Sequence, residues 1–133
     1  MNKKAVIVSC IAAAFLVSCS GASIYSMYAE RAREKAGLSE KKAACGNFAI
    51  SYLEGGSGET LVLVHGFGAE KNYWTPMAAY MKEYHCVIPD LTGFGASSKD
   101  DALSYDVESQ ADRLHAFFAA IGLKTFYIAG NSM

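Results

Sequence analysis

The chain has 133 residues, 52% of them hydrophobic and 12% aromatic, which suits a packed core and argues against a disordered protein. It carries 12 basic and 13 acidic residues, and this near balance gives no support to a nucleic-acid partner. The composition therefore favours a globular domain.

The N-terminus has the pattern of an export signal. Lys3 and Lys4 precede an apolar run from Ala5 to Val17, and small residues follow the run. The run is too short for a comfortable membrane span, so the pattern favours a targeting segment over a core helix.

The residues Leu16-Val17-Ser18-Cys19 resemble the lipobox of bacterial lipoproteins, in which cleavage before the cysteine exposes a thiol for lipid attachment. We therefore predict a lipoprotein-type signal peptide over 1–18 and lipidation at Cys19. The acyl chains would hold an exported protein on a membrane, on its periplasmic or cell-surface side. Ordinary cleavage near Ala22 and an uncleaved anchor are the alternatives.

Residues 19–42 are mostly polar and charged, which predicts a tether between the anchor and a domain over 43–133. Two short β segments are expected at the start of this domain, over 42–45 and 48–54. The dipeptide Gly46-Asn47 between them suits the positive φ angles of a tight hairpin turn.

Two of the four cysteines lie in the export signal, because Cys10 is in the apolar run and Cys19 would be lipidated. Cys45 and Cys86 could pair in an oxidising compartment. Cys86, however, lies in a predicted buried strand, where a free cysteine is a common small hydrophobe. The sequence favours two unpaired thiols.

The continuous β-branched and apolar run over 60–64 is typical of a strand covered on both faces, and the run over 86–88 predicts another buried strand. A third strand is expected over 125–129. Helical segments separate them, and this order implies right-handed crossovers and a parallel sheet. The carboxyl ends of the strands then meet at one sheet edge, where ligand sites of open α/β sheets lie. The loops that leave this edge are 65–68, 90–98 and 130–133.

Both intervening helices carry start signals. In the first, Thr75-Pro76 suits an N-cap followed by proline, and apolar residues follow at helical spacing. These residues are Trp74, Met77, Ala78 and Met81. The second helix can be capped by Asp106 and ended by Gly122. Its expected apolar stripe consists of Val107, Ala111, Leu114, Phe118 and Ile121.

In order and separation, the three loops resemble those of the α/β-hydrolase fold, and the resemblance extends from Phe48 to the chain end. It implies the N-terminal half of that fold, a mostly parallel sheet flanked by helices and preceded by a hairpin. Phe67-Gly68, Trp74 and Asn131-Ser132-Met133 are similar to the corresponding residues of exported bacterial lipases and esterases.

The resemblance also implies roles for single residues. Ser132 would be the nucleophile of an elbow, and the backbone N–H groups of Phe67 and Met133 would stabilise the oxyanion. The residues expected to shape the loops are His65, Gly66, Gly68, Asp90, Gly93, Gly95 and Gly130. No cofactor or metal is implied.

The residue that activates Ser132 is not identified, because the triad of this fold runs in the order Ser, acid, His. Every candidate precedes Ser132: His65, His85, His115, Asp90, Asp106 and Asp112. By the resemblance, His65 holds the oxyanion loop in shape, and His115 is a helix-surface residue. We therefore expect an N-terminal fragment of a longer hydrolase that is itself inactive.

The expected parent is a serine hydrolase acting on small-molecule or lipid esters of carboxylic acids. A serine at the elbow disfavours dehalogenases and epoxide hydrolases, whose equivalent residue is usually Asp. Other serine members, such as C–C bond hydrolases and haloperoxidase-like enzymes, stay open. A surface-anchored binding protein that has kept the fold without the chemistry is the alternative from another class, and a fragment that does not fold is a third possibility.

Overall fold

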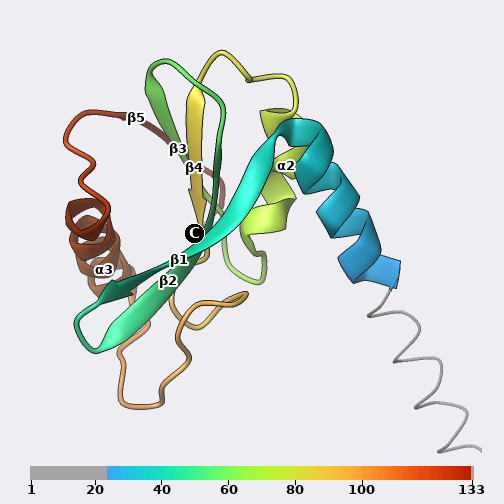
Figure 1. Cartoon of the computed structure of the whole chain (residues 1–133). Coiled ribbons are helices and arrows are strands. Elements are labelled where there is room, and N and C mark those ends of the chain that lie inside the picture. The colour runs from blue at the N-terminus through green and yellow to red at the C-terminus, as the bar shows by residue number, and fades with distance from the viewer. Residues whose placement is uncertain (1–23, 133) are drawn as a thin grey trace, which may run out of the picture. The chain divides into compact units, whose positions relative to one another are not determined.

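The computed structural model of the chain describes residues 24–132 (Figure 1). The predicted signal peptide 1–18, the lipidation site Cys19 and the oxyanion donor Met133 lie outside these residues. The chain divides into two units, 1–31 and 32–133, and the sheet belongs to the second. Within the described part of the chain, no helix has both the length and the apolar character needed to cross a membrane.

The second unit is built on a five-stranded sheet in the order β1-β2-β4-β3-β5. Its strands are β1 (Leu38–Cys45), β2 (Phe48–Gly55), β3 (Thr60–Val64), β4 (His85–Pro89) and β5 (Tyr127–Gly130). β3 pairs in parallel with both β4 and β5, as predicted. The hairpin of β1 and β2 extends this parallel part through an antiparallel pairing with β4, so the whole sheet is mixed.

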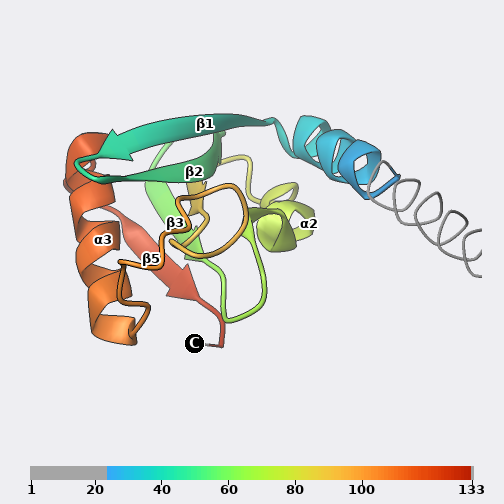
Figure 2. The same ribbon diagram turned by 90° about the horizontal axis from the view of Figure 1, so that it is seen from below.

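Helices cover both faces of the sheet (Figure 2). One face packs against the 3-10 helix η1 (Lys71–Trp74) and the one-turn helix α2 (Thr75–Ala78), the other against α3 (Val107–Ala120). Successive strand residues alternate between the two cores because their side chains point to opposite faces. The first core contains Ala36, Leu38, Leu53, Leu63, Trp74, Ala78, Cys86 and Ile88. The second contains Cys45, Ile50, Tyr52, Val62, Val87, Phe117 and Phe118.

Strand β1 begins at Leu38, earlier than the expected start at residue 42, so the last residues of the predicted tether belong to the sheet. Leu38 is buried and pairs with Gly55, the last residue of β2. The charged residues at the start of β1 made this segment look like a solvated tether. They fit into the sheet because two of them form ion pairs. Glu40 pairs with Lys71, and Lys41 pairs with Glu54.

The first predicted helix is confirmed only in part. Trp74 and Ala78 are buried as expected, but Met77 is exposed, and the segment splits into η1 and α2. Trp74, rather than Thr75, is the N-cap residue of α2, since the Thr75 hydroxyl donates a hydrogen bond back to the Asn72 carbonyl at 2.8 Å.

Helix α3 has the predicted ends. The Asp106 carboxylate accepts a hydrogen bond from the Ser109 N–H at 2.8 Å, and Gly122 follows the helix with a φ of 75°. Its buried face differs from the expected stripe, because Val107 is 65% exposed while Gln110 is buried. The polar Gln110 occupies this inward position because it has hydrogen-bond partners there.

Candidate active site

The candidate elbow directly follows β5. Ser132 has a φ of +46° and is the one residue other than glycine with a positive φ among residues 24–132. Such a conformation costs a serine about 1–3 kcal/mol and is typical of the strained strand-to-helix turn that exposes a nucleophile. The Asn131 N–H donates to the Val64 carbonyl at 3.2 Å, so pairing with β3 continues up to the turn. Ser132 is exposed.

The close approach at the elbow is made by Gly66 in the loop after β3. A Cβ on Gly66 would lie 2.0 Å from the Ser132 carbonyl oxygen and 2.3 Å from that of Asn131. A Cβ on Gly130 would make only an ordinary contact, 3.8 Å from the Val64 oxygen. The absence of a side chain is therefore needed at Gly66, while the described contacts give Gly130 no comparable steric role.

The structure brings Phe67 and Ser132 together. The Phe67 N–H donates a hydrogen bond to the Ser132 carbonyl oxygen at 3.1 Å. As an oxyanion donor, this N–H would have to exchange that carbonyl for a substrate oxygen. Gly68 follows with a φ of 74° in open space, so its conformation, not a close contact, requires glycine.

His65 is 1% exposed and uses both ring nitrogens. Nε2 accepts the Leu91 N–H at 3.0 Å, and Nδ1 lies 2.8 Å from the Gly66 carbonyl oxygen. Because an amide N–H only donates and a carbonyl only accepts, the proton of the neutral ring lies on Nδ1. Neither ring nitrogen is left to act as a base, and this supports the loop-shaping role of His65.

Asp90 is fully buried at the end of β4 and organises the next loop. Its Oδ2 accepts the Ala96 N–H at 2.8 Å, and its two oxygens accept the Lys71 N–H at 2.6 Å and the Lys71 ammonium at 2.7 Å. A Cβ on Gly95, whose φ is +49°, would lie 2.0 Å from Oδ2. Asp90 and Gly95 therefore lie in direct contact, and a side chain at position 95 would displace the carboxylate.

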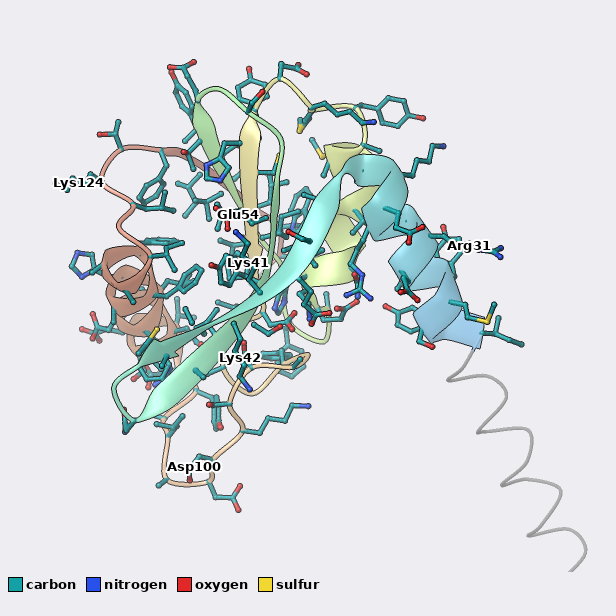
Figure 3. The ribbon with its side chains drawn as sticks, in the orientation of Figure 1. Arg31, Lys41, Lys42, Glu54, Asp100 and Lys124 are labelled. Carbon is teal, nitrogen blue, oxygen red and sulfur yellow. The ribbon has the colours of Figure 1, made fainter. Side chains whose placement is uncertain are left out.

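A cavity of about 360 Å³ adjoins this part of the site. Its walls include the rings of Phe67, Phe94 and Tyr105, and residues 99–101 contribute polar groups; Figure 3 labels Asp100 in this loop. The Phe94 ring lies 5.4 Å from the His65 ring and 5.7 Å from the Phe67 ring, centroid to centroid. Phe67 therefore lines the cavity and also contacts the elbow through its backbone N–H.

The family follows from the sequence comparison. The sequence profile described as the α/β hydrolase fold matches residues 59–133, which is more than half of the chain. The chain belongs to the α/β hydrolase fold family. The predicted fold class is confirmed, with the five-stranded mixed sheet as its form in this chain.

Several relatives of this α/β hydrolase chain are lipases. Lipase 1 of Psychrobacter immobilis is 46% identical over 85 residues, which cover 62% of this chain and 27% of that lipase. Lipase 3 of Moraxella sp. strain TA144 is 46% identical over 78 residues, covering 58% of this chain and 25% of that lipase. The chain thus spans about a quarter of the length of these two relatives.

A solved structure shows the same fold. The crystal structure of a membrane phospholipase A, described as a bacterial virulence factor, matches with a TM-score of 0.81 and 43% identity, covering 96% of this chain and 42% of that chain.

Three polar residues of this α/β hydrolase chain, Lys71, Gln110 and Arg113, were missed by the sequence analysis. Lys71 is 3% exposed, and Gln110 is 2% exposed. The Thr92 hydroxyl donates to Gln110 Oε1 at 2.9 Å, and Arg113 Nε donates to the Thr92 hydroxyl at 2.7 Å. The Arg113 guanidinium lies 5.8 Å from the centre of the Tyr105 ring. Lysine, glutamine and arginine are usually exposed, so no sequence signal marked them.

The other two histidines have roles away from the elbow. His85 Nε2 lies 2.7 Å from a Glu54 carboxylate oxygen, and its Nδ1 lies 3.1 Å from the Thr60 hydroxyl. His115 is exposed on α3, as predicted. Among residues 24–132, no group of three or more His, Cys, Asp or Glu side chains could hold a metal ion.

Proposed function

We propose that the protein to which this chain belongs is a serine hydrolase that cleaves carboxylic esters, of the lipase or esterase type, through an acyl-enzyme at Ser132. The observation that carries the proposal is the strained, exposed Ser132 after β5, in backbone contact with Phe67. The 46% identity to two lipases supports an ester substrate.

The proposed chemistry begins when Ser132 Oγ attacks the ester carbonyl carbon and gives up its proton to a base. The carbonyl oxygen becomes an oxyanion, and the backbone N–H groups of Phe67 and Met133 donate to it. The alcohol leaves with a proton, and water then releases the acid and restores the serine. The Phe67 N–H already lies beside Ser132, where it would exchange the Ser132 carbonyl for the oxyanion.

We propose that the base and the triad acid come from a part of the protein beyond these 133 residues. Two observations support this. His65 has no free ring nitrogen, and the chain spans about a quarter of its lipase relatives. The 133-residue chain alone is then expected to show no turnover of p-nitrophenyl esters. Turnover by this chain that disappears in Ser132→Ala would contradict that expectation.

The cavity beside Phe67 is the proposed binding site for the apolar part of a small-molecule or lipid ester. Its volume of about 360 Å³ falls in the usual range for ligand pockets, and beside the polar residues 99–101 it has aromatic walls at Phe67, Phe94 and Tyr105. Such walls bind hydrocarbon through burial of apolar surface.

We further propose that the protein is exported and held on a membrane by lipid attached to Cys19. The support is the residue pattern alone, a short apolar run ending in a lipobox-like tetrapeptide. Metabolic labelling with a palmitate analogue should depend on this cysteine. Unchanged labelling of a Cys19→Ala variant would reject lipid attachment.

Labelling of the full-length protein with a fluorophosphonate probe tests the enzyme proposal. The wild type and the control variant Ser57→Ala, in the exposed turn after β2, should be labelled, whereas Ser132→Ala should not. An unlabelled wild type would favour the non-catalytic binding protein. A labelled protein without ester turnover would favour another serine member of the family.

A further inference from the structure

Lys71 is a buried lysine directly after the loop that carries Phe67. Its side chain is 4% exposed, with Nζ 2.7 Å from Asp90 Oδ2 and 3.0 Å from Glu40 Oε1. Its own backbone N–H donates to Asp90 Oδ1 at 2.6 Å. One residue therefore binds both oxygens of a single carboxylate, once through its backbone and once through its side chain.

This contact fixes one end of the segment 65–71, and His65 fixes the other. The Leu91 N–H donates to His65 Nε2, while Asp90 accepts from Lys71, so both ends of the segment are attached to two consecutive residues after β4. The segment contains Gly66 and Gly68, whose backbones are permissive, and one internal hydrogen bond, from the Ala69 N–H to the Gly66 carbonyl at 3.2 Å. We therefore infer that its position depends largely on the two attachments.

Phe67 lies at the middle of the segment, and its side chain is not buried as those of His65 and Lys71 are, although its ring contacts the Phe94 ring. It is 85% exposed, and its N–H contacts the Ser132 carbonyl at 3.1 Å. A shift at either attachment would therefore move this N–H relative to Ser132. Donors at an oxyanion site act through their fixed position, and misplacement by about 1 Å can cost about 100-fold in rate.

A purely structural ion pair is the competing explanation, and the chain contains a matched example. Lys41 Nζ lies 2.7 Å from Glu54 Oε2 across β1 and β2, and Figure 3 labels both residues. The Lys41 side chain is 50% exposed, and its contacts do not include the segment 65–71. Lys41 is therefore a control for the loss of a lysine from an ion pair of the same length.

We propose that Lys71 is a positioning residue for the reaction, which holds the Phe67 N–H at the oxyanion site by binding the end of its loop to Asp90. The inference rests on the proposed function. It assigns no contact between Lys71 and the substrate.

The test compares Lys71→Met with Lys41→Met in the full-length protein, with kcat expressed per site counted by the p-nitrophenol burst. Lys71→Met should lower kcat by about 10- to 100-fold and leave KM within about threefold, because the donor acts mainly in the transition state. Lys41→Met should leave both constants unchanged. A Lys71→Met variant with wild-type kcat per site, or with the loss confined to KM, would overturn the proposal.

Lys71→Arg covers the case in which the Met variant has no competent sites. It keeps a positive charge beside Asp90 and should give a full burst. The larger, planar guanidinium cannot reproduce the paired contacts of Lys71, so kcat per site should fall by less than in Lys71→Met but at least about threefold. An Arg variant with wild-type kcat per site, beside a Met variant with no burst, would indicate a structural role only.

Hydrogen exchange separates this inference from the proposed function. Peptides over 66–71 should exchange faster in Lys71→Met than in Lys41→Met, while peptides from β3 and β4 should not change. A wild type without esterase activity would reject the function, and the exchange result would still test the attachment. Equal exchange over 66–71 in both variants would reject the attachment itself.

Discussion

The loop after β3 and the elbow after β5 leave neighbouring strands, and they are held by different kinds of contact. The first is fixed by buried side chains, since His65 is 1% exposed and its partner loop carries the fully buried Asp90. Among residues 24–132, the elbow follows the edge strand β5, whose Tyr127 and Ile128 are 57% and 58% exposed, and its hydrogen bonds are made by the backbone. The donor side of the site is thus formed by packing, while the nucleophile side depends on strand pairing and on one close glycine contact.

Gly66→Ala should break the contact between the loop after β3 and the elbow, and we expect it to lower activity more than any other change described below. The new Cβ would lie 2.0 Å from the Ser132 carbonyl oxygen, so one backbone must move. We expect kcat/KM of the full-length protein to fall by at least about 100-fold in ester hydrolysis assays.

Gly68→Ala is the matched control for this change. Its Cβ would meet nothing within 4 Å, and only the positive φ penalises it, by about 1–2 kcal/mol. Its loss of activity should be much smaller than that of Gly66→Ala. Equal losses in the two variants would show that backbone strain, not the close approach to Ser132, is what the loop requires.

Asp90→Asn should destabilise the side that is held by buried side chains. Lys71 would keep its charge without its buried partner, and removal of one member of a buried pair costs about 3–5 kcal/mol. Urea unfolding of the full-length protein measures the change. Asp112→Asn, at an exposed position of α3, should stay within about 0.5 kcal/mol of the wild type. Equal stability of the two variants would contradict the importance of the buried pair.

Tyr105→Ala should change substrate binding more than catalysis. The ring lines the cavity and is close to Gly93, where a Cβ would lie 2.8 Å from it. Loss of this apolar wall should raise KM for long-chain esters by about tenfold, with kcat little changed. Tyr80→Ala, at a position 84% exposed and not among the residues of this cavity, is the control. Unchanged KM in both variants would place the ester elsewhere.

Glu40→Gln should have the smallest effect, seen only in the pH dependence of stability. Burial by itself raises the pKa of Glu40, but the hydrogen bond and charge of Lys71, together with hydrogen bonds from Ser51 and Arg33, outweigh burial, and the pKa lies below its usual value of 4.5. The ionised Glu40 carboxylate therefore stabilises the fold fully at pH values above its usual pKa of 4.5. This contribution is lost as the pH falls through the lowered pKa. Chemical unfolding at several pH values should show the wild type losing its advantage over Glu40→Gln only in acid. A constant difference would contradict this.

The opposite sign holds for Lys71. Burial by itself lowers its pKa, but the bonds and charges of Asp90 and Glu40 outweigh burial and raise it. Its contribution to stability is therefore complete at neutral pH and is lost only as the pH rises through the raised pKa, on the alkaline side. Acid and alkali thus weaken this network through different residues.

The parts of the fold that could be predicted are those in which local pattern and tertiary contact agree. The apolar run at 60–64 is buried in the sheet, and Asp106 caps α3 through its own side chain. Strand β1 was predicted too short because the four residues after Leu38 are Ser39, Glu40, Lys41 and Lys42. Their partners, such as Lys71 and Glu54, lie far away in the sequence, so local composition could not show them.

The same limit applies to the site. The order of the three loops was enough to predict that Gly66, Phe67 and Ser132 lie close together, because parallel strands place their carboxyl ends at one edge of the sheet. The burial of Lys71 depends on its contact with the Asp90 carboxylate, and the burial of Gln110 depends on its contact with the Thr92 hydroxyl. That information exists only after the chain has folded, and a single sequence carries no local signal for it.

The two cores also keep apart the two thiols of the sheet. Cys45 and Cys86 are free, and they lie in the cores on opposite faces, with the sheet between them. Burial raises the pKa of both thiols, and the charge of Glu83 adds to this for Cys86. Since the thiolate is the reactive form, burial protects both cysteines from oxidation as long as the two cores stay packed against the sheet. Each cysteine can therefore serve as a reporter of opening, with Cys86 becoming reactive when the α2 face separates and Cys45 when the hairpin lifts from α3.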